Sequence, residues 1–188
     1  EANVRYDGSS MFPDGKKFGF FPSFSAGWRA SEESFFQWAK PALSDLKIRG
    51  SWGTIGNQDV AANTFISTMA SGTSGWVVNG VNLLRLSAPT VISSALTWEK
   101  VTTLDLGFDA RLFDGAFGVT FDWYQRVTSD MHTAGVTLPS TFGASVPKIN
   151  YGELTATGWE LALDYSHKFS NGLGLNVRGS ISHVTEEI

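Results

Sequence analysis

Few residues of this sequence have the types and the spacing that catalysis or metal binding requires. Cysteine is absent, which excludes disulfides, a thiolate nucleophile and a thiolate metal site. The histidines are His132, His167 and His183, and none has the sequence spacing of a metal ligand pair. Only His132, near Asp130, offers a conceivable acid–base dyad, and the polarity of a loop explains both residues more simply. We therefore expect no enzyme, no metal site and no cofactor.

The acidic residues are also poorly placed for shared proton chemistry or for calcium. Asp105 and Asp109 are four positions apart on a predicted strand, which separates them by about 13 Å at about 3.3 Å per residue. Asp7-Gly8-Ser9-Ser10 and Asp14-Gly15-Lys16 lack the bidentate acid of an EF-hand, so we interpret them as turns. The net charge of -4 provides no basic stripe for nucleic acid.

These polar residues fall within a regular alternation, which is clearest in the segment 96–112. Its even-numbered positions are mostly apolar and its odd-numbered positions mostly polar or small. Strict period-two alternation predicts a β-strand with two chemically different faces. At about 3.3 Å per residue this strand would span about 53 Å, far more than a typical globular strand. A membrane barrel whose strands project beyond the bilayer needs such a length.

The same alternation recurs along the chain and predicts an all-β, antiparallel protein. The predicted long strands are 18–29, 45–56, 96–112, 116–127, 157–169 and 173–184, and residues 2–6 are a candidate for the end of another. Tight turns at 113–116 and 170–172 alternate with long polar loops at 56–95 and 128–153, while the middling link 31–45 is expected to hold one or two helical turns. Short periplasmic turns opposite long extracellular loops are typical of transmembrane barrels. This arrangement predicts that strands 18–29, 96–112 and 157–169 run inward and that the others run outward.

A strand with two such faces fits either a membrane barrel or a soluble β-sandwich, and three features favour the barrel. Bare charges lie near the strand centres on one face, the other face is almost free of charge for ~9–11 residues, and aromatic residues gather towards the strand ends. The predicted lumen-facing polar residues are Glu99, Asp105, Asp109, Asp122, Glu160, Asp164 and Arg178. The predicted membrane-interface aromatics are Trp28, Trp52, Trp98, Phe113, Phe117, Trp123, Trp159 and Phe169. Burial of Leu104, Phe121 and Leu163 together between two layers would exclude the barrel.

Five ordered blocks carry a resemblance to a known family. They are Arg5-Tyr-Asp-Gly-Ser-Ser10, Gly19-Phe-Phe-Pro-Ser-Phe-Ser-Ala-Gly-Trp28 with Ser31-Glu-Glu33, Leu43-Ser-Asp-Leu-Lys-Ile-Arg-Gly-Ser-Trp-Gly-Thr-Ile-Gly-Asn-Gln58, Leu96-Thr-Trp-Glu-Lys-Val-Thr-Thr-Leu-Asp-Leu-Gly-Phe-Asp109, and Asn150-Tyr-Gly-Glu-Leu-Thr-Ala-Thr-Gly-Trp-Glu-Leu161. In order and spacing they resemble the SusC/RagA family of TonB-dependent outer-membrane transporters over nearly the whole chain. We interpret two signature positions as structural: Gly56 is expected to permit a sharp exit from its strand, and Glu99 to pair with Arg49 or Lys47.

The resemblance implies a barrel of about 22 strands with an N-terminal plug. Residues 1–188 would be part of its β-barrel domain, without the plug, the TonB box and the closing strands, and both chain ends are expected to be cuts through a longer chain. The resemblance also implies a multi-pass protein of the bacterial outer membrane that imports oligosaccharides or peptides. A SusD-like surface lipoprotein would cover its mouth, and TonB-ExbB-ExbD would supply energy through the plug.

The loop aromatics are the candidate ligand-binding residues, because aromatic faces bind apolar surfaces of sugars and peptides. They are Phe65, Trp76 and Phe142, and the alternative is that they pack within their own loops. Two other functions stay open from the residues alone: a passive porin-like barrel and a soluble β-sandwich module that binds carbohydrate.

Overall fold

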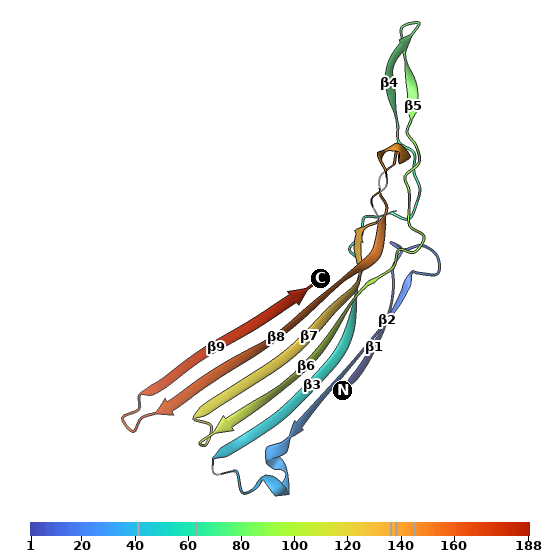
Figure 1. Cartoon of the computed structure of the whole chain (residues 1–188). Coiled ribbons are helices and arrows are strands. Elements are labelled where there is room, and N and C mark those ends of the chain that lie inside the picture. The colour runs from blue at the N-terminus through green and yellow to red at the C-terminus, as the bar shows by residue number, and fades with distance from the viewer. Residues whose placement is uncertain (41, 63, 136, 138, 145) are drawn as a thin grey trace.

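The computed structural model describes residues 1–40, 42–62, 64–135, 137, 139–144 and 146–188. Its main feature is a seven-stranded antiparallel sheet in the order β1-β2-β3-β6-β7-β8-β9, accompanied by a separate two-stranded hairpin, β4-β5 (Figure 1). The strands are β1 (Ala2–Gly8), β2 (Phe18–Arg29), β3 (Leu43–Asn57), β4 (Ser71–Val78), β5 (Val81–Leu86), β6 (Glu99–Leu112), β7 (Phe117–Ala134), β8 (Lys148–Lys168) and β9 (Gly174–Glu187). Three short 3-10 turns are η1 (Ala30–Glu32), η2 (Ser34–Phe36) and η3 (Ser140–Phe142).

All six predicted long strands are present, and residues 2–6 belong to β1. The predicted all-β, antiparallel fold class is therefore confirmed. Among the described residues, no helix is both long and apolar enough to span a bilayer.

The loop 128–153 was predicted too long, because β7 and β8 continue far into it. Their pairing shifts register between Thr128 and Met131, and Asp130 takes a positive φ of 57° at this point. Such an irregularity inserts extra residues without ending the ladder, so the alternation is interrupted while the strand continues. The alternation therefore could not reveal the outer third of this hairpin.

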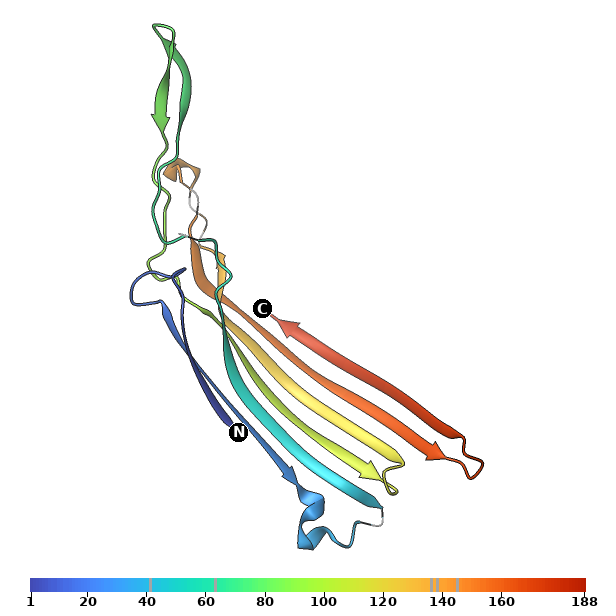
Figure 2. The same ribbon diagram turned by 180° about the vertical axis from the view of Figure 1, so that it is seen from behind.

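The loop 56–95 also contains structure that was not predicted, since β4 and β5 form a hairpin within it. The hairpin turns at Asn79-Gly80, where both residues have positive φ, of 52° and 78°. Asn-Gly is the preferred pair for a turn with two positive φ values. The hairpin stands away from the sheet, beyond the ends of the long strands (Figures 1 and 2).

The connections divide between the two ends of the sheet as predicted. The links β2–β3, β6–β7 and β8–β9 lie at one end, and the links β1–β2, β3–β6 and β7–β8 lie at the other (Figure 1). We call these the short-turn end and the outer end. The sheet is open, with β1 and β9 as its two edges.

Cross-strand register separates the two faces cleanly, because directly paired residues share a face. One row runs Ile48, Phe108, Phe121, Leu161, Ile181, and the adjacent row runs Arg49, Gly107, Asp122, Glu160, Ser182. We call these sides the apolar face and the charged face. No second layer of the described residues covers the apolar face, where Leu163 remains 39% exposed. Leu104 and Phe121 are only half-buried, so the sealed interior of a β-sandwich is excluded.

The buried hydrophobic cluster lies at the outer end rather than between sheets. Its members are Phe12, Phe21, Val60, Leu96 and Trp98. They come from β2 and from the β1–β2 and β3–β6 links, so this cluster ties two outer loops to the sheet.

Candidate functional site: the charged face and the outer loops

Arg49 is the centre of an ion-pair network on the charged face. Its Nε lies 2.9 Å from Asp109 Oδ2, and its Nη1 and Nη2 lie 2.8 and 2.9 Å from the two carboxylate oxygens of Asp122. Arg49 on β3 reaches Asp122 on β7 by crossing β6 at Gly107. A Cβ at Gly107 would overlap Asp122 Oδ1 and lie 2.7 Å from the backbone oxygen of Phe121. The close approach of Arg49 to Asp122 therefore requires glycine at this position.

The same arrangement occurs one strand further along. Arg111 on β6 crosses Gly118 on β7, and its Nη1 donates to Asp164 Oδ2 on β8. A Cβ at Gly118 would overlap both partners. Each of these two rows of arginine, glycine and aspartate thus links three strands. The register also places Arg178 of β9 directly opposite Asp164 of β8.

All seven predicted lumen-facing residues lie on this charged face. The register places Glu99, Asp105 and Asp109 of β6, Asp122 of β7, Glu160 and Asp164 of β8, and Arg178 of β9 on the same side. Their shared side is set by the structure, and their exposure to a barrel lumen stays a prediction.

Glu99 does not pair with Arg49 or Lys47, so that prediction is wrong. Its Oε2 accepts a 2.7 Å hydrogen bond from Asn57 Nδ2, and its Oε1 accepts one of 2.7 Å from the backbone N–H of His132. The physical reason is the register of β3 and β6. It places Glu99 opposite Asn57 at the outer end, and it places Arg49 opposite Gly107, closer to the short-turn end.

His132 is a packed residue of β7 rather than a loop residue, and its side chain is only 4% exposed. Its Nδ1 lies 3.2 Å from Glu99 Oε1, and its Nε2 is 2.8 Å from the carbonyl oxygen of Thr97. The ring is therefore held between β6 and the chain that enters it. This arrangement fastens the outer end of the sheet.

Asn150 also joins these segments at the outer end of the sheet. Its residue type did not predict this role. Its Nδ2 donates to the carbonyl oxygens of Thr97 and Asp130 at 2.8 and 2.7 Å, and its Oδ1 accepts from Thr97 N at 2.9 Å. One amide side chain thus satisfies three backbone groups on two other segments. Its place at the start of the last resemblance block was the available signal.

Trp98 is not an interface aromatic, so this part of the prediction is corrected. It is 5% exposed, packs edge-on against Phe21 at 5.5 Å, and donates from Nε1 to the carbonyl oxygen of Lys17 at 3.1 Å. Strand β6 begins at Glu99, so Trp98 lies just outside the ladder, and alternation does not determine where its ring points.

The remaining predicted interface aromatics lie on the apolar face or in the short-turn links, although the longer β7 and β8 place Trp123 and Trp159 in mid-strand rather than near strand ends. Register places Trp28, Trp52, Phe117, Trp123 and Trp159 on the apolar face, and Phe113 and Phe169 lie exposed in short-turn links. Their contact with lipid stays a prediction.

Gly56 also has a different role from the one expected. It lies inside β3, and a Cβ there would overlap the ring of Phe21. The same ring covers Gly19. The Phe21 ring therefore packs against the backbone of these two glycines, where a side chain would collide with it.

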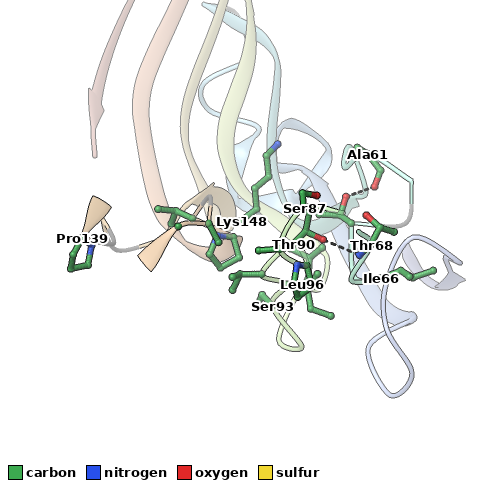
Figure 3. A pocket seen from close by; sticks show the side chains of 18 residues that line it. Ala61, Ile66, Thr68, Ser87, Thr90, Ser93, Leu96, Pro139 and Lys148 are labelled. Atoms are coloured by element: carbon green, nitrogen blue, oxygen red, sulfur yellow. Dashed lines mark hydrogen bonds between the residues drawn. The ribbon is translucent and has the colours of Figure 1, made fainter. Parts of the chain in front are cut away.

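A cavity of about 760 Å³ lies among the outer loops, lined by described residues of the segments 61–68, 87–96 and 139–148 (Figure 3). In its wall Thr68 N donates a 3.0 Å hydrogen bond to Thr90 Oγ1. Phe65, Trp76 and Phe142 do not line it. Phe65 is half-buried, Phe142 is exposed in η3, and Trp76 is 76% exposed on the distant β4-β5 hairpin. The structure does not bring the three together, and ligand binding by them stays a prediction.

The chain matches the family model described as TonB dependent receptor-like, beta-barrel, over residues 1–187. TonB-dependent receptor P26 of Formosa agariphila is 32% identical over 160 residues, which covers 85% of this chain and 16% of that protein. TonB-dependent receptor SusC of Bacteroides thetaiotaomicron is 29% identical over 196 residues, covering 97% of this chain and 19% of that protein.

The fold also matches that of the RagAB peptide importer in its open-open state, with a TM-score of 0.82 and 24% identity. This match covers 99% of this chain and 20% of that chain. The chain thus spans about a fifth of the length of the relatives it matches or less. Residues 1–187 therefore belong to the β-barrel family of TonB-dependent receptor-like proteins, and the resemblance to SusC and RagA is confirmed.

Proposed function

We propose that this chain forms part of the wall and the extracellular loops of a TonB-dependent outer-membrane importer of oligosaccharides or peptides. The observation that carries the proposal is a family match along the whole sheet, in which one face is charged and the other is apolar. The apolar face contacts acyl chains, and the charged face lines a hydrated lumen. Water in the lumen hydrates the charged side chains, and their ion pairs reduce the free-energy cost of desolvating them.

The interaction with a SusD-like surface lipoprotein is supported by the β4-β5 hairpin. It exposes Trp76, Val81 and Leu84, and it lies beyond the outer ends of the strands (Figure 1). An isolated two-stranded hairpin is marginally stable in water, and exposed apolar patches mark interaction sites. The hairpin therefore docks the lipoprotein, and energy from TonB-ExbB-ExbD reaches the importer through a plug that lies outside residues 1–188.

The outer-loop cavity is the ligand contact that this chain contributes. It lies at the mouth end of the sheet, and its volume is within the range of small-molecule sites. Lys148 is the charged side chain among its described lining residues. The described lining contains no aromatic ring, so Phe65, Trp76 and Phe142 of the outer loops are the candidates from this chain for stacking on a sugar.

Uptake by the full-length receptor in its host tests the proposal. Labelled oligosaccharides and labelled peptides are supplied to cells with and without TonB, and we expect one of the two classes to enter only when TonB is present. Equal uptake without TonB would instead support the passive porin-like barrel.

A tagged receptor tests the docking hairpin separately. Replacement of residues 71–86 by Gly-Gly should reduce co-purified lipoprotein at least about tenfold, a loss of about 1.4 kcal/mol in binding. The matched control is Arg85→Gln, which keeps the apolar hairpin and should retain the lipoprotein. Unchanged co-purification after the replacement would contradict the docking role.

A further inference from the structure

The β2–β3 link, described at residues 30–40 and 42, exposes large aromatic side chains at the short-turn end. Phe35 is 61% exposed and Trp38 is 84% exposed, although both belong to residue types that usually avoid water. The link lies beside the β6–β7 turn, because Phe113 N donates a 3.0 Å hydrogen bond to the carbonyl oxygen of Ala42.

Successive tight turns form the part of the link that carries these two rings. Backbone hydrogen bonds span three residues at Glu33 to Ala30, Phe36 to Glu33, Ala39 to Phe36 and Ala42 to Ala39. In this 3-10-type geometry, side chains three positions apart eclipse one another. Phe35 and Trp38 are three positions apart along these turns, so we expect both rings to project from one edge.

The ring of Phe35 continues the apolar face of the sheet. The ring centroids of Phe35 and Trp28 are 6.2 Å apart, and Trp28 lies on the apolar face opposite Ile48. The indole Nε1 of Trp28 donates a 3.0 Å hydrogen bond to Glu33 Oε1, which satisfies the polar end of the ring. On the other side, Ser31 is fully buried and its Oγ donates to Asp45 Oδ1 at 2.7 Å. The link is thus held at its start by Ser31, and its Phe35 ring lies against Trp28 of the apolar face.

The other two links at this end show the same feature. The β6–β7 turn exposes Phe113, and the β8–β9 turn exposes Phe169 and Leu173. An exposed aromatic side chain in each of the three links at one end matches an interfacial belt, where a ring has one side in hydrocarbon and the other among headgroups.

We infer that the described part of the β2–β3 link, residues 30–40 and 42, is a membrane-anchoring segment that lies in the short-turn-end leaflet, with the rings of Phe35 and Trp38 inserted among the phospholipid headgroups. This inference rests on the proposed lipid contact of the apolar face. If the apolar face contacts lipid, aromatic rings that continue this face also contact lipid. We expect the two rings to lie about 5–10 Å into the boundary between headgroups and acyl chains.

Site-directed spin labelling of the full-length receptor in phosphatidylcholine vesicles tests the inference. Residues 1–188 contain no cysteine, so Phe35→Cys and Trp38→Cys introduce single labelling sites once any cysteine elsewhere in the receptor is replaced. The matched control is Gln37→Cys, an exposed neighbour on another side of the turns. Leu106→Cys reports on the apolar face, where the native side chain is exposed. Accessibility to oxygen reports lipid, and accessibility to a water-soluble nickel complex reports water.

Labels at 35 and 38 should show an oxygen-to-nickel accessibility ratio several-fold higher than the label at 37. A lipid signal at 106 combined with water exposure at both 35 and 38 overturns the anchoring segment and leaves the proposed function intact. Labels at 35 and 38 that neither reagent reaches also overturn it, because a protein surface then covers them. Water exposure at 106 refutes the proposed lipid face itself. Phe35→Cys and Trp38→Cys are independent variants, so misfolding of one leaves the other as the test.

Discussion

The Phe21 ring and the glycines beneath it offer a test in which one substitution should cancel another. A Cβ at Gly56 would overlap the ring tip and lie 2.7 and 2.8 Å from Cε1 and Cε2. Phe21 itself is buried and packs edge-on against Trp98. Gly56→Ala must therefore displace a ring that is already held by the outer-end cluster.

The magnitudes follow from cavity and overpacking costs. Phe21→Ala should lower the free energy of unfolding by about 3–5 kcal/mol, because it empties a buried aromatic site. Gly56→Ala in the wild-type background should lower it by about 1–3 kcal/mol, because the added methyl forces the ring from its place. In the Phe21→Ala background the methyl meets no ring, and the loss of glycine's unfolded-state freedom should make Gly56→Ala neutral or stabilising by about 0.4–1 kcal/mol.

The assay is equilibrium unfolding of the full-length receptor in vesicles, by guanidinium, for the four members of this double-mutant cycle. Gly27→Ala is the control in β2, since its Cβ would meet the flexible end of Lys47 at 3.3 Å and the backbone oxygen of Ile48 at an ordinary contact distance of 3.9 Å. It should show the same small effect with or without Phe21. If Gly56→Ala has an equal cost in both backgrounds, the ring does not pack on this glycine and the description of the cluster is wrong.

Two further substitutions test the Asn150 hydrogen bonds at the outer end and the Arg49 ion pairs on the charged face. Asn150→Ala removes three hydrogen bonds to Thr97 and Asp130, so it should lower the free energy of unfolding by about 2–4 kcal/mol. It should also speed hydrogen exchange of the Thr97 amide, which donates one of these bonds. The control is Tyr151→Ala at the exposed neighbour, which should change the free energy of unfolding by less than about 0.5 kcal/mol. Arg49→Met leaves Asp109 and Asp122 unpaired and should cost about 1–3 kcal/mol, against less than about 1 kcal/mol for Arg5→Met, whose pair with Asp7 is more exposed. Unfolding curves measure both comparisons, and protection of Thr97 in Asn150→Ala or equal costs for the two arginines would contradict them.

The alternation of side chains determined more of this fold than any single motif did. The six long strands and their two faces follow from it, because in an extended chain each side chain's direction is set by its own backbone. The seven charged residues consequently share one face, as predicted. The ordered blocks added the family, which composition and alternation alone left open.

Whatever depended on which residues lie opposite one another was decided only by the tertiary structure. The partners of Glu99, the crossing of Arg49 over Gly107 and the burial of Trp98 all depend on register and on where a ladder starts. A shift of one residue in pairing moves a whole strand's side chains to the other face, and local preferences do not set that pairing. The sequence by itself therefore determined what each strand presents, and contacts between distant segments determined what each side chain meets.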